Sequence, residues 1–297
     1  MNYPKVSIII LNWNGLRDTI ECLESLKKVT YSNYDIIIVD NGSKGNDAEV
    51  LEEKYGNWIY IIKNEKNLGY AGGCNVGIKH VLEQDTEYVL ILNNDVVVEN
   101  NFLSELIKIA ETTPDMGIAG PKVYYYNDPN RLYACGERIN YWLLTTKNGN
   151  NEIDNDQFNQ IEYVDGIVGC AILIKKKVFK TIGMFDEDYF SYGEETDFCI
   201  RAKKAGFHIV YVPTAKVWHK DMGSTGGKLN KFVAYYQTRN RIMLIRKTLG
   251  KKYWITALSF FLFKTTKQIC KNIIRRKPEI AGAMLRGLGY HLKIENR

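Results

Sequence analysis

The sequence lacks the features that mark several specialised classes of protein. Its six cysteines form no C-x-x-C pair, so neither a disulfide framework nor a thiolate metal cluster is indicated. No internal repeat or low-complexity segment occurs. The longest apolar stretch, residues 254–263, has only half of the ~20 residues that a membrane-spanning helix requires. These absences leave a globular protein of 297 residues, long enough for one large domain or two joined halves.

Acidic residues are almost missing from the C-terminal end. Residues 239–297 hold 15 Lys and Arg but only Glu279 and Glu295, whereas residues 1–238 hold 25 Lys and Arg against 32 Asp and Glu. The net charge of +6 therefore hides an acidic body and a basic tail. A nucleic-acid binder with a uniformly basic surface would not show this distribution, so we expect no nucleic acid and an anionic partner for the tail.

The first hundred residues alternate between strand and helix signals. Apolar, β-branched runs at residues 6–11, 35–40, 58–62 and 87–92 predict buried strands. Residues 16–28, 46–55 and 75–84 predict helices between them. This order favours a parallel sheet with helices on both faces. No signal-peptide pattern stands before the first run, so we expect a cytoplasmic protein with reduced thiols.

The order of predicted strands and helices becomes less regular in the second part of the chain. From about residue 110, prolines and glycines interrupt the alternation, and residues 122–165 predict mixed strands and polar loops. Regular signals return with strands at 170–174 and 208–212, the latter closed by Pro213, and with helices at 175–182 and 195–205.

Polar clusters follow three of the predicted parallel strands. They are Asn12-Trp13-Asn14, Asp40-Asn41 and Asn93-Asn94-Asp95. Each cluster alone is explained as a turn or a helix cap. Ligands of parallel α/β sheets gather at the carboxyl ends of the strands, so three clusters together favour a binding site. A hard divalent cation on a substrate diphosphate needs only one or two carboxylates, which suits the single Asp95.

A glycine-rich segment at residues 67–77 connects a predicted strand to a predicted helix. Its glycines allow the backbone to approach a ligand closely, and the helix presents its positive end to an anion. It matches neither the G-x-G-x-x-G dinucleotide motif nor the P-loop. A tight connection with no ligand is the alternative.

The densest acidic cluster contains Glu194, Glu195 and Asp197. Acidic residues stabilise a helix N-terminus, so capping charge is one interpretation. The aromatic neighbours Phe190 and Tyr192 favour another, because they would desolvate a carboxyl and raise its pKa, as a general base requires. His219 ends an apolar run and is either a structural residue or a metal ligand.

These motifs resemble the inverting family-2 glycosyltransferases of the GT-A fold, and among them the rhamnosyltransferase-like enzymes of surface polysaccharide synthesis. The resemblance runs from about residue 6 to 241 and is carried by residues 7–15, 39–43, 67–77, 92–95 and 165–219. It implies a mostly parallel central sheet with flanking helices and a C-terminal helical tail. It also implies a nucleotide-sugar-binding half at 1–110, an acceptor and catalytic half of the same domain at 111–235, and a basic amphipathic tail at 236–297.

The resemblance also implies roles for individual residues. Asp95 corresponds to the last acidic position of the D-x-D motif and should hold Mg²⁺ or Mn²⁺ together with His219. Glu195 takes the place of the catalytic base in the E-D-x-[DE] motif, with Glu194 and Asp197 as further candidates. The substrate-binding positions are Asn12, Asn14, Asp40, Asn67, Gly69, Asn75, Asn93, Asn94 and Arg239.

Two departures from the family pattern qualify these roles. Asn93 replaces the first carboxylate of the D-x-D motif, and Glu195 is one methylene longer than the Asp that relatives often have. A catalytically inactive nucleotide-sugar-binding protein is therefore one alternative. A sugar nucleotidyltransferase is another, although residues 11–15 contain no basic residue of the kind its first loop would need.

The expected partners follow from the resemblance and from the tail. We expect the donor to be a nucleotide sugar, dTDP-rhamnose before others. We expect the acceptor to be a glycan or a lipid-diphosphate-linked glycan, and Arg239 would face the phosphate of such an acceptor. Residues 254–263 and 275–277 combine apolar and cationic side chains, as interfacial helices on anionic lipid do. This pattern predicts a peripheral protein on the inner face of the cell membrane. A solvated helical pair packed on the body is the alternative.

Overall fold

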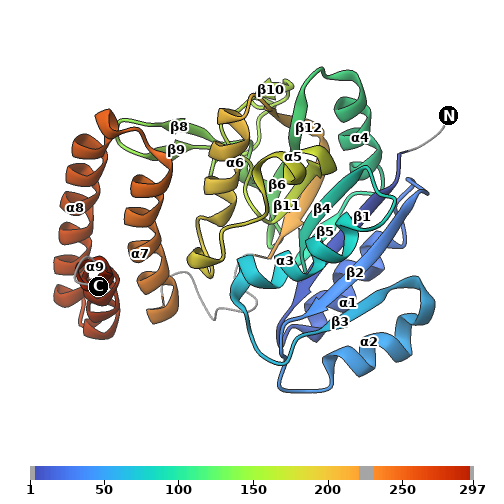
Figure 1. Ribbon diagram of the computed structural model, residues 1–297, viewed down its shortest axis with the longest axis horizontal. Helices are drawn as coiled ribbons and strands as arrows, with labels where there is room; N and C mark the ends of the chain where they lie inside the picture. Colours follow the sequence, from blue (N-terminus) through green and yellow to red (C-terminus); the bar gives the residue numbers. More distant parts are fainter. Residues whose placement is uncertain (1–3, 221–229, 295–297) are drawn as a thin grey trace.

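The computed structural model describes residues 4–220 and 230–294 (Figure 1). Its N-terminal part is a parallel sheet with crossover helices. The strands are β1 Val6–Asn12, β2 Tyr34–Asp40, β3 Tyr60–Lys63 and β4 Tyr88–Asn93, and the helices are α1 Leu16–Leu26, α2 Asp47–Tyr55 and α3 Gly69–Leu82. β1 is central and pairs in parallel with β2 and β4. The strand and helix order predicted for this half is confirmed.

The second part of the chain extends the same sheet into a mixed parallel and antiparallel one, and two of its strands form a separate small sheet. Its strands are β5 Val96–Val98, β6 Met116–Tyr125, β7 Asp128–Ala134, β8 Arg138–Asn140, β9 Thr145–Lys147, β10 Glu162–Tyr163, β11 Ala171–Lys175 and β12 His208–His219. Its helices are α4 Phe102–Thr112, α5 Lys176–Ile182 and α6 Glu194–Lys204, with short 3-10 turns η1 Gly56–Trp58 and η2 Glu187–Tyr189 in the chain. The main sheet has the order β10-β12-β6-β11-β4-β1-β2-β3. β11 is antiparallel to both β4 and β6, and β12 is parallel to β6.

Both faces of this sheet are buried, which explains the unbroken apolar runs of its strands. Successive residues of a strand point to opposite faces. Ile8 and Ile10 of β1 belong to the core formed with α1, α2 and α4, whereas Ile9 belongs to the core formed with α3, α5 and α6. The site at the strand ends therefore rests on a layer packed from both sides.

Three local predictions about helices and strands were wrong. α3 begins at Gly69 and not at residue 75, because the glycines lie inside the helix, where a Cβ at Gly77 would meet Ile9 at 2.7 Å. β12 continues through Pro213, since its register shifts between Val212 and Lys216 and a bulge tolerates proline. Helix α4 was not predicted, although its buried residues repeat at helical spacing.

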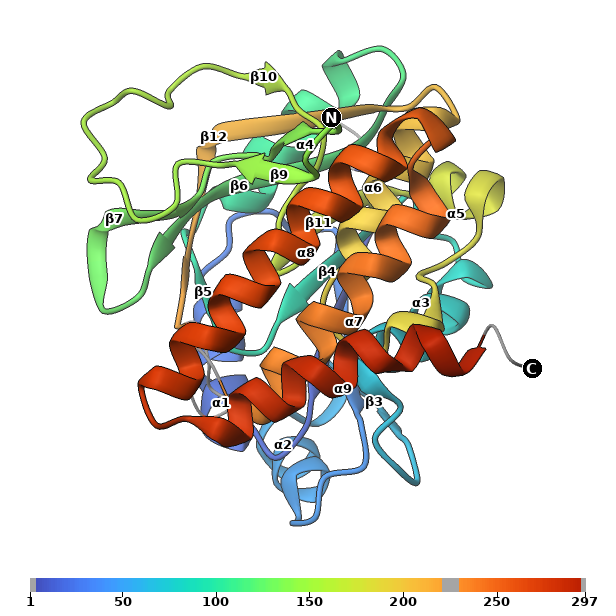
Figure 2. The same cartoon turned by 90° about the vertical axis from the view of Figure 1, so that its left-hand side faces the viewer.

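The C-terminal region forms three helices beside the sheet domain. They are α7 Lys231–Thr248, α8 Lys251–Ile274 and α9 Pro278–Ile294. Figure 2 shows α9 crossing α7 and α8. Gly287 permits this crossing, because a Cβ there would lie 2.8 Å from the carbonyl oxygen of Tyr235. The predicted division at residue 236 falls inside α7 and stays a prediction. Among the helices described, none combines the length and the hydropathy needed to cross a bilayer.

Candidate active site

A cavity of about 270 Å³ lies at the carboxyl ends of β1 and β4. Three stretches predicted from sequence meet in its walls: the turn after β4, the start of α6 and the end of β12. The lining side chains come from Leu11, Trp13, Asn41, Asn67, Gly69, Tyr70, Asn93, Asn94, Asp95, Tyr133, Val168, Gly169, Cys170, Phe190, Ser191, Tyr192, Glu194, Glu195, His219 and Phe232. Eight of the predicted site residues are among them, so the predicted metal ligands and the predicted base line one cavity.

Asp95 and His219 form a close pair in this cavity. His219 Nε2 lies 3.1 Å from Asp95 Oδ1, and both side chains are almost completely buried. The antiparallel pairing of β5 with β12 sets His219 opposite Val96 and so brings the two side chains together. The ring of Tyr133 packs edge-on against the imidazole at 4.8 Å. The pair is therefore fixed by the sheet and by packing.

This pair fits a divalent cation whose remaining ligands come from a substrate. Two ligands of one ion, with bonds of about 2.1 Å at a right angle, stand about 3 Å apart, close to the separation of Nε2 and Oδ1. Residues 4–220 and 230–294 contain no group of three or more His, Cys, Asp or Glu suited to hold a metal. The protein therefore offers a sparse site, as the single carboxylate of Asn93-Asn94-Asp95 predicts.

The two asparagines before Asp95 are tied to neighbouring elements. Asn93 Oδ1 accepts a hydrogen bond of 2.8 Å from the Tyr70 hydroxyl. Asn94 Nδ2 donates to Thr19 Oγ1 at 3.0 Å and to the carbonyl oxygen of Gly15 at 3.3 Å. Both residues reach the cavity while their amides fasten the β4 turn to α3 and α1.

Glu194 and Glu195 open helix α6, and each carboxyl group affects the pKa of the other. Burial raises the pKa of Glu194 well above its ordinary range, and repulsion by Glu195 raises it further. Burial also raises the pKa of Glu195, against hydrogen bonds from backbone N–H groups that include Gly193. Glu195 Oε2 accepts the Gly193 bond at 3.2 Å. The pKa of Glu194 is therefore raised more strongly than that of Glu195, so Glu195 is the member of the pair that ionises more readily, and its role as the base stays a prediction.

Asp197 does not line the cavity. Its carboxylate accepts a hydrogen bond of 2.6 Å from Arg201 Nε, and Arg201 also donates to the carbonyl oxygens of Ile182 and Met184. Burial raises the pKa of Asp197 in spite of the arginine. The carboxylate fastens α6 to the preceding loop, and its catalytic role stays a prediction that this geometry does not support.

Asn12, Asn14 and Asp40 form a network beside the cavity and do not line it. Asn12 Nδ2 donates to Asp40 Oδ2 at 2.8 Å, and Asp40 Oδ1 accepts from the Ser43 amide at 3.0 Å. The backbone N–H of Asn14 donates to Ser43 Oγ at 2.9 Å. These bonds connect the ends of β1 and β2, so contact of the three side chains with a nucleotide stays a prediction.

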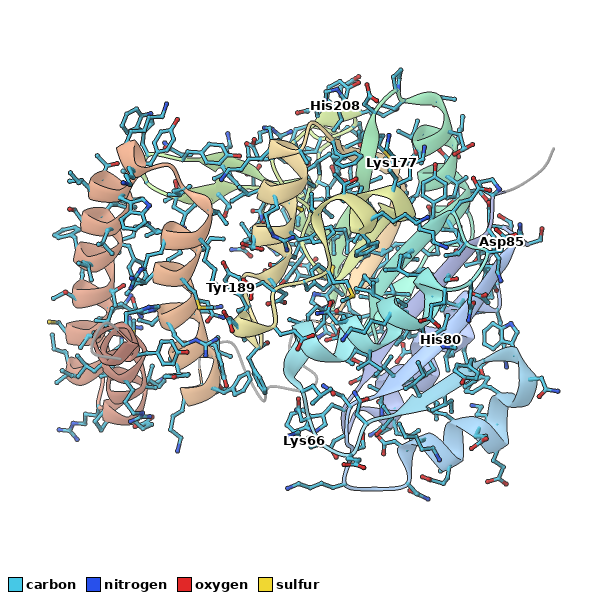
Figure 3. All side chains as sticks on the ribbon, viewed as in Figure 1. Lys66, His80, Asp85, Lys177, Tyr189 and His208 are labelled. Atoms are coloured by element: carbon cyan, nitrogen blue, oxygen red, sulfur yellow. The ribbon has the colours of Figure 1, made fainter. Side chains whose placement is uncertain are left out.

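Asn75 and Arg239 also lie outside the cavity lining. The Asn75 amide donates to the carbonyl oxygen of Phe185 and accepts from its N–H, at 2.9 and 3.1 Å. Arg239 Nη2 donates to the carbonyl oxygen of Tyr189 at 2.7 Å and is buried. Tyr189 lies between the sheet domain and the C-terminal helices (Figure 3). Both side chains hold loops in place, and their predicted substrate contacts stay untested.

Asn41 belongs to one of the predicted polar clusters, but no role of its own was predicted for it. Its Nδ2 donates to Asn67 Oδ1 at 3.1 Å and to the carbonyl oxygen of Gly69 at 3.0 Å, and its Oδ1 accepts from the Leu68 N–H at 3.1 Å. Asn67 Oδ1 also accepts from the Gly69 N–H at 2.7 Å. Asn41 therefore shapes the loop at 67–69, which forms one wall of the cavity. Its position beside Asp40 at a strand end was the available signal.

Glu137 is a residue that sequence analysis missed. It is buried, and its Oε2 has no hydrogen-bond partner among the residues that the structure describes. Burial raises its pKa to about 7, the charge of Glu195 adds to the rise, and Arg241 opposes it. No local pattern marks Glu137, because only the fold brings it near Glu195.

Comparison with known proteins agrees with this geometry. Residues 7–183, more than half of the chain, match the family model described as glycosyl transferase family 2. An N-acetylglucosaminyl-diphospho-decaprenol L-rhamnosyltransferase of Mycobacterium tuberculosis is 26% identical over 81% of this chain and 83% of its own length. A dTDP-rhamnosyl transferase of Shigella flexneri is 24% identical over 83% of this chain and 81% of its own length.

A solved structure supports the same fold. The mannosyltransferase of Pyrobaculum calidifontis in complex with GDP-Man and Mn²⁺ matches with a TM-score of 0.62 and 12% identity, over 98% of this chain and 88% of that one. The mixed sheet, the cavity at its strand ends and the family match lead to one conclusion. This chain belongs to glycosyl transferase family 2.

Proposed function

We propose that the protein transfers a sugar from a nucleoside-diphosphate donor to a hydroxyl group of a glycan or lipid-linked glycan, with inversion at the anomeric carbon. One observation carries the proposal: the Asp95–His219 pair and the Glu194–Glu195 pair face the same cavity. Because two relatives are named as rhamnosyltransferases, dTDP-rhamnose is the first donor to test.

Asp95 and His219 would hold a divalent cation on the donor diphosphate. Such a cation stabilises the negative charge that develops on the leaving nucleoside diphosphate. Imidazole nitrogen is a softer ligand than the oxygens that Mg²⁺ prefers, and the similar solved mannosyltransferase holds Mn²⁺, so Mn²⁺ is the first ion to test. Asn67 and Gly69, in the wall shaped by Asn41, would border the nucleotide.

Glu195 would remove the proton from the acceptor hydroxyl as its oxygen attacks the anomeric carbon. The hydrogen bond from Gly193 holds the carboxylate in place, and burial keeps its pKa above the ordinary value, which strengthens it as a base. Glu194 retains its proton and leaves a single negative charge on the pair. One displacement at carbon then gives the inverted product without a covalent intermediate.

Helix α8 would bring the protein to the inner surface of the cell membrane, where a lipid-linked acceptor resides. Its outer face exposes large apolar side chains, and cationic side chains flank them. The exposed apolar residues are Ile255, Leu262, Phe263, Ile273 and Ile274, and the exposed cations are Lys251, Lys252, Lys264, Lys267, Lys271, Arg275, Arg276 and Lys277. An apolar strip between cations suits a surface of anionic lipid.

The decisive experiment measures hydrolysis of a panel of nucleotide sugars, dTDP-rhamnose among them, with Mn²⁺ and with chelator. We expect metal-dependent release of nucleoside diphosphate and loss of at least about 100-fold in Glu195→Gln. Glu52→Gln, on an exposed helix position, is the matched control and should equal the wild type. NMR of the product should show the inverted anomer.

Two outcomes would contradict the proposal. Release of pyrophosphate from a nucleoside triphosphate and a sugar phosphate would identify a nucleotidyltransferase. Binding of nucleotide sugars without any turnover, equal in the wild type and in Glu195→Gln, would identify an inactive binding protein.

A further inference from the structure

The segment that leads into α6 has an unusual backbone. Phe190, Tyr192 and Gly193 all have positive φ, at 63°, 71° and 101°. Large side chains rarely adopt this region, and such residues persist only where the surroundings hold them. Phe190 and Tyr192 also line the cavity. The strained segment is therefore part of the active site, and something must maintain it.

Asn240 of α7 holds this segment from the side of the C-terminal helices. Its Nδ2 lies 2.9, 2.7 and 2.7 Å from the carbonyl oxygens of Tyr189, Ser191 and Tyr192, and its two hydrogens are shared among these three acceptors. Its Oδ1 accepts from Arg239 Nε at 2.7 Å, and the side chain is almost completely buried. Every polar atom of the Asn240 amide is thus committed to the loop or to its neighbour.

The opposite side of the segment rests on the first turn of α3. The N–H groups of Tyr70 and Ala71 both donate to the carbonyl oxygen of Phe190. Gly69 leaves room for this contact, because a Cβ there would lie 2.4 Å from the same oxygen. The segment is therefore held between two helices that belong to different parts of the chain.

One peptide unit connects Asn240 to the predicted base. The carbonyl oxygen of Tyr192 accepts from Asn240 Nδ2, and the N–H of the same peptide, on Gly193, donates to Glu195 Oε2 at 3.2 Å. The peptide is planar, so fixing its carbonyl also fixes the direction of its N–H. The orientation of the Glu195 carboxylate thus depends on a side chain 45 residues later in the sequence.

We propose that Asn240 is a positioning residue for catalysis: through the Tyr192–Gly193 peptide it orients the carboxylate of Glu195 toward the acceptor hydroxyl. The proposal rests on the proposed function, in which Glu195 is the base. Other groups face Glu195 as well, namely Glu194 from α6, Glu137 from the β7–β8 turn and Tyr70 from α3. Asn240 differs from them because it carries no charge and acts only through geometry.

The test compares Asn240→Ala and the isosteric Asn240→Asp with Asn272→Ala. Asn272 is a matched control, since it is a buried asparagine whose Nδ2 donates to the carbonyl oxygen of Gln268 in α8. With the nucleotide sugar that the wild type hydrolyses, we expect kcat to fall about 10-fold to 100-fold in both Asn240 variants, with KM nearly unchanged. Asn272→Ala should keep the wild-type kcat. Mn²⁺-dependent binding of dTDP, measured by calorimetry, should be equal in all four proteins.

The pH profile separates positioning from a general loss of structure. The Gly193 hydrogen bond lowers the pKa of Glu195, so losing it should move the acid limb of kcat to higher pH. A loop that merely opened to water would move the limb to lower pH, because desolvation is the main cause of the raised pKa. A shift to lower pH, no shift, or wild-type kcat in the Asn240 variants would overturn the proposal.

Hydrogen exchange gives a readout that does not depend on turnover. Peptides that cover residues 188–195 should exchange faster in the Asn240 variants than in the wild type and in Asn272→Ala. Equal exchange in all of them would refute the positioning role. A wild type that hydrolyses no nucleotide sugar would refute the proposed function alone, because the exchange result would still decide whether Asn240 holds the segment.

Discussion

Glu137 is a buried carboxyl group near the Glu194–Glu195 pair, and it has no assigned task. In the unfolded chain the carboxyl group of Glu137 has its ordinary pKa of about 4.5, whereas in the folded protein its pKa is about 7. The group therefore stabilises the fold below about pH 4.5, and this contribution is lost as the pH rises through 7.

Glu137→Gln should remove this pH dependence, because glutamine imitates the protonated form. At about pH 8 we expect the variant to be more stable than the wild type by up to about 3 kcal/mol, and at about pH 4.5 the two should be equal. Chemical denaturation at both pH values measures the difference. An exposed control, Glu52→Gln, should change neither value. Equal stability of Glu137→Gln and wild type at high pH would show that Glu137 ionises normally.

Asp95 is the only carboxylate in the turn after β4, so the metal should depend on it. Asp95→Ala should abolish the Mn²⁺-dependent part of dTDP binding and leave the thermal midpoint in buffer without metal nearly unchanged. Calorimetry with Mn²⁺ and with chelator makes the comparison. Asp85→Ala is the control, because Asp85 is exposed at the far end of the sheet (Figure 3). Unchanged binding in Asp95→Ala would contradict the metal role.

Site residues that a nearby sequence pattern marks could be predicted from the sequence. Residues whose role depends on partners far away in the sequence could not. Asp95 and His219 stand at the ends of apolar runs, Glu195 stands in the densest acidic cluster, and the structure places all three on the cavity. Asn240 and Glu137 carry no such mark, since their partners lie about 45 to 60 positions away. Polar residues inside a helix or a turn look alike until the fold shows what they face.

Helix α3 depends on a glycine at its first position. Gly69 has φ of +78°, and a Cβ there would overlap the carbonyl oxygen and the ring of Phe190. Gly183 has the same φ, but a Cβ there meets nothing within 4 Å. The two glycines form a matched pair, with backbone strain in both and steric overlap in only one.

Gly183→Ala should therefore cost about 1 to 3 kcal/mol of stability, because φ of 78° with ψ of −166° is a conformation that residues other than glycine rarely adopt, and it should leave turnover unchanged. Gly69→Ala should cost about 3 kcal/mol or more, because overlap adds to strain, and turnover should fall with it. Denaturation midpoints and nucleotide-sugar hydrolysis measure both effects. Equal losses in the two variants would show that the contact between α3 and Phe190 is dispensable.

Elements with a strong period were predicted well, and elements set by close packing were not. The apolar runs of β1, β2 and β4 predicted buried strands because both of their faces are covered. The start of α3 was misplaced because glycines signal a loop unless the neighbouring sheet is known. Residues 215–218 were expected to be strand-like, but their continuity with residues 208–212 through Pro213 was missed, since only the partner strands show where a bulge fits.

The whole molecule has an acidic catalytic body and a basic helical flank, and α8 forms the outer face of that flank. Its predicted membrane contact is best tested by substitution, because α9 packs on α7 and His291 bonds the carbonyl oxygen of Arg239 at 2.8 Å. Deleting both helices would disturb Arg239 and its neighbour Asn240. A loss of lipid binding in such a deletion would then be difficult to interpret.

Replacing Ile255 and Phe263 together by Asn should reduce binding to anionic phospholipid vesicles by about 10-fold or more, since each loses an apolar side chain from the interface. Added salt should weaken binding of the wild type as well. Tyr163→Asn is the control, because Tyr163 is equally exposed but lies on β10. Sedimentation with vesicles measures the binding of the wild type, the double variant and the control. Equal sedimentation of the double variant and the wild type would exclude α8 as the anchor.

The position of β12 has a consequence for synthesis of the chain. Because domains form from the N-terminus during translation, β1 to β4 and β6 emerge well before residue 208. Until β12 arrives, one edge of β6 stays open, and open edges invite pairing with other chains. His219 is also the last residue of β12, so a chain that ends before it lacks one member of the proposed metal-binding pair. Under the proposed function, metal binding would therefore distinguish finished molecules from incomplete ones.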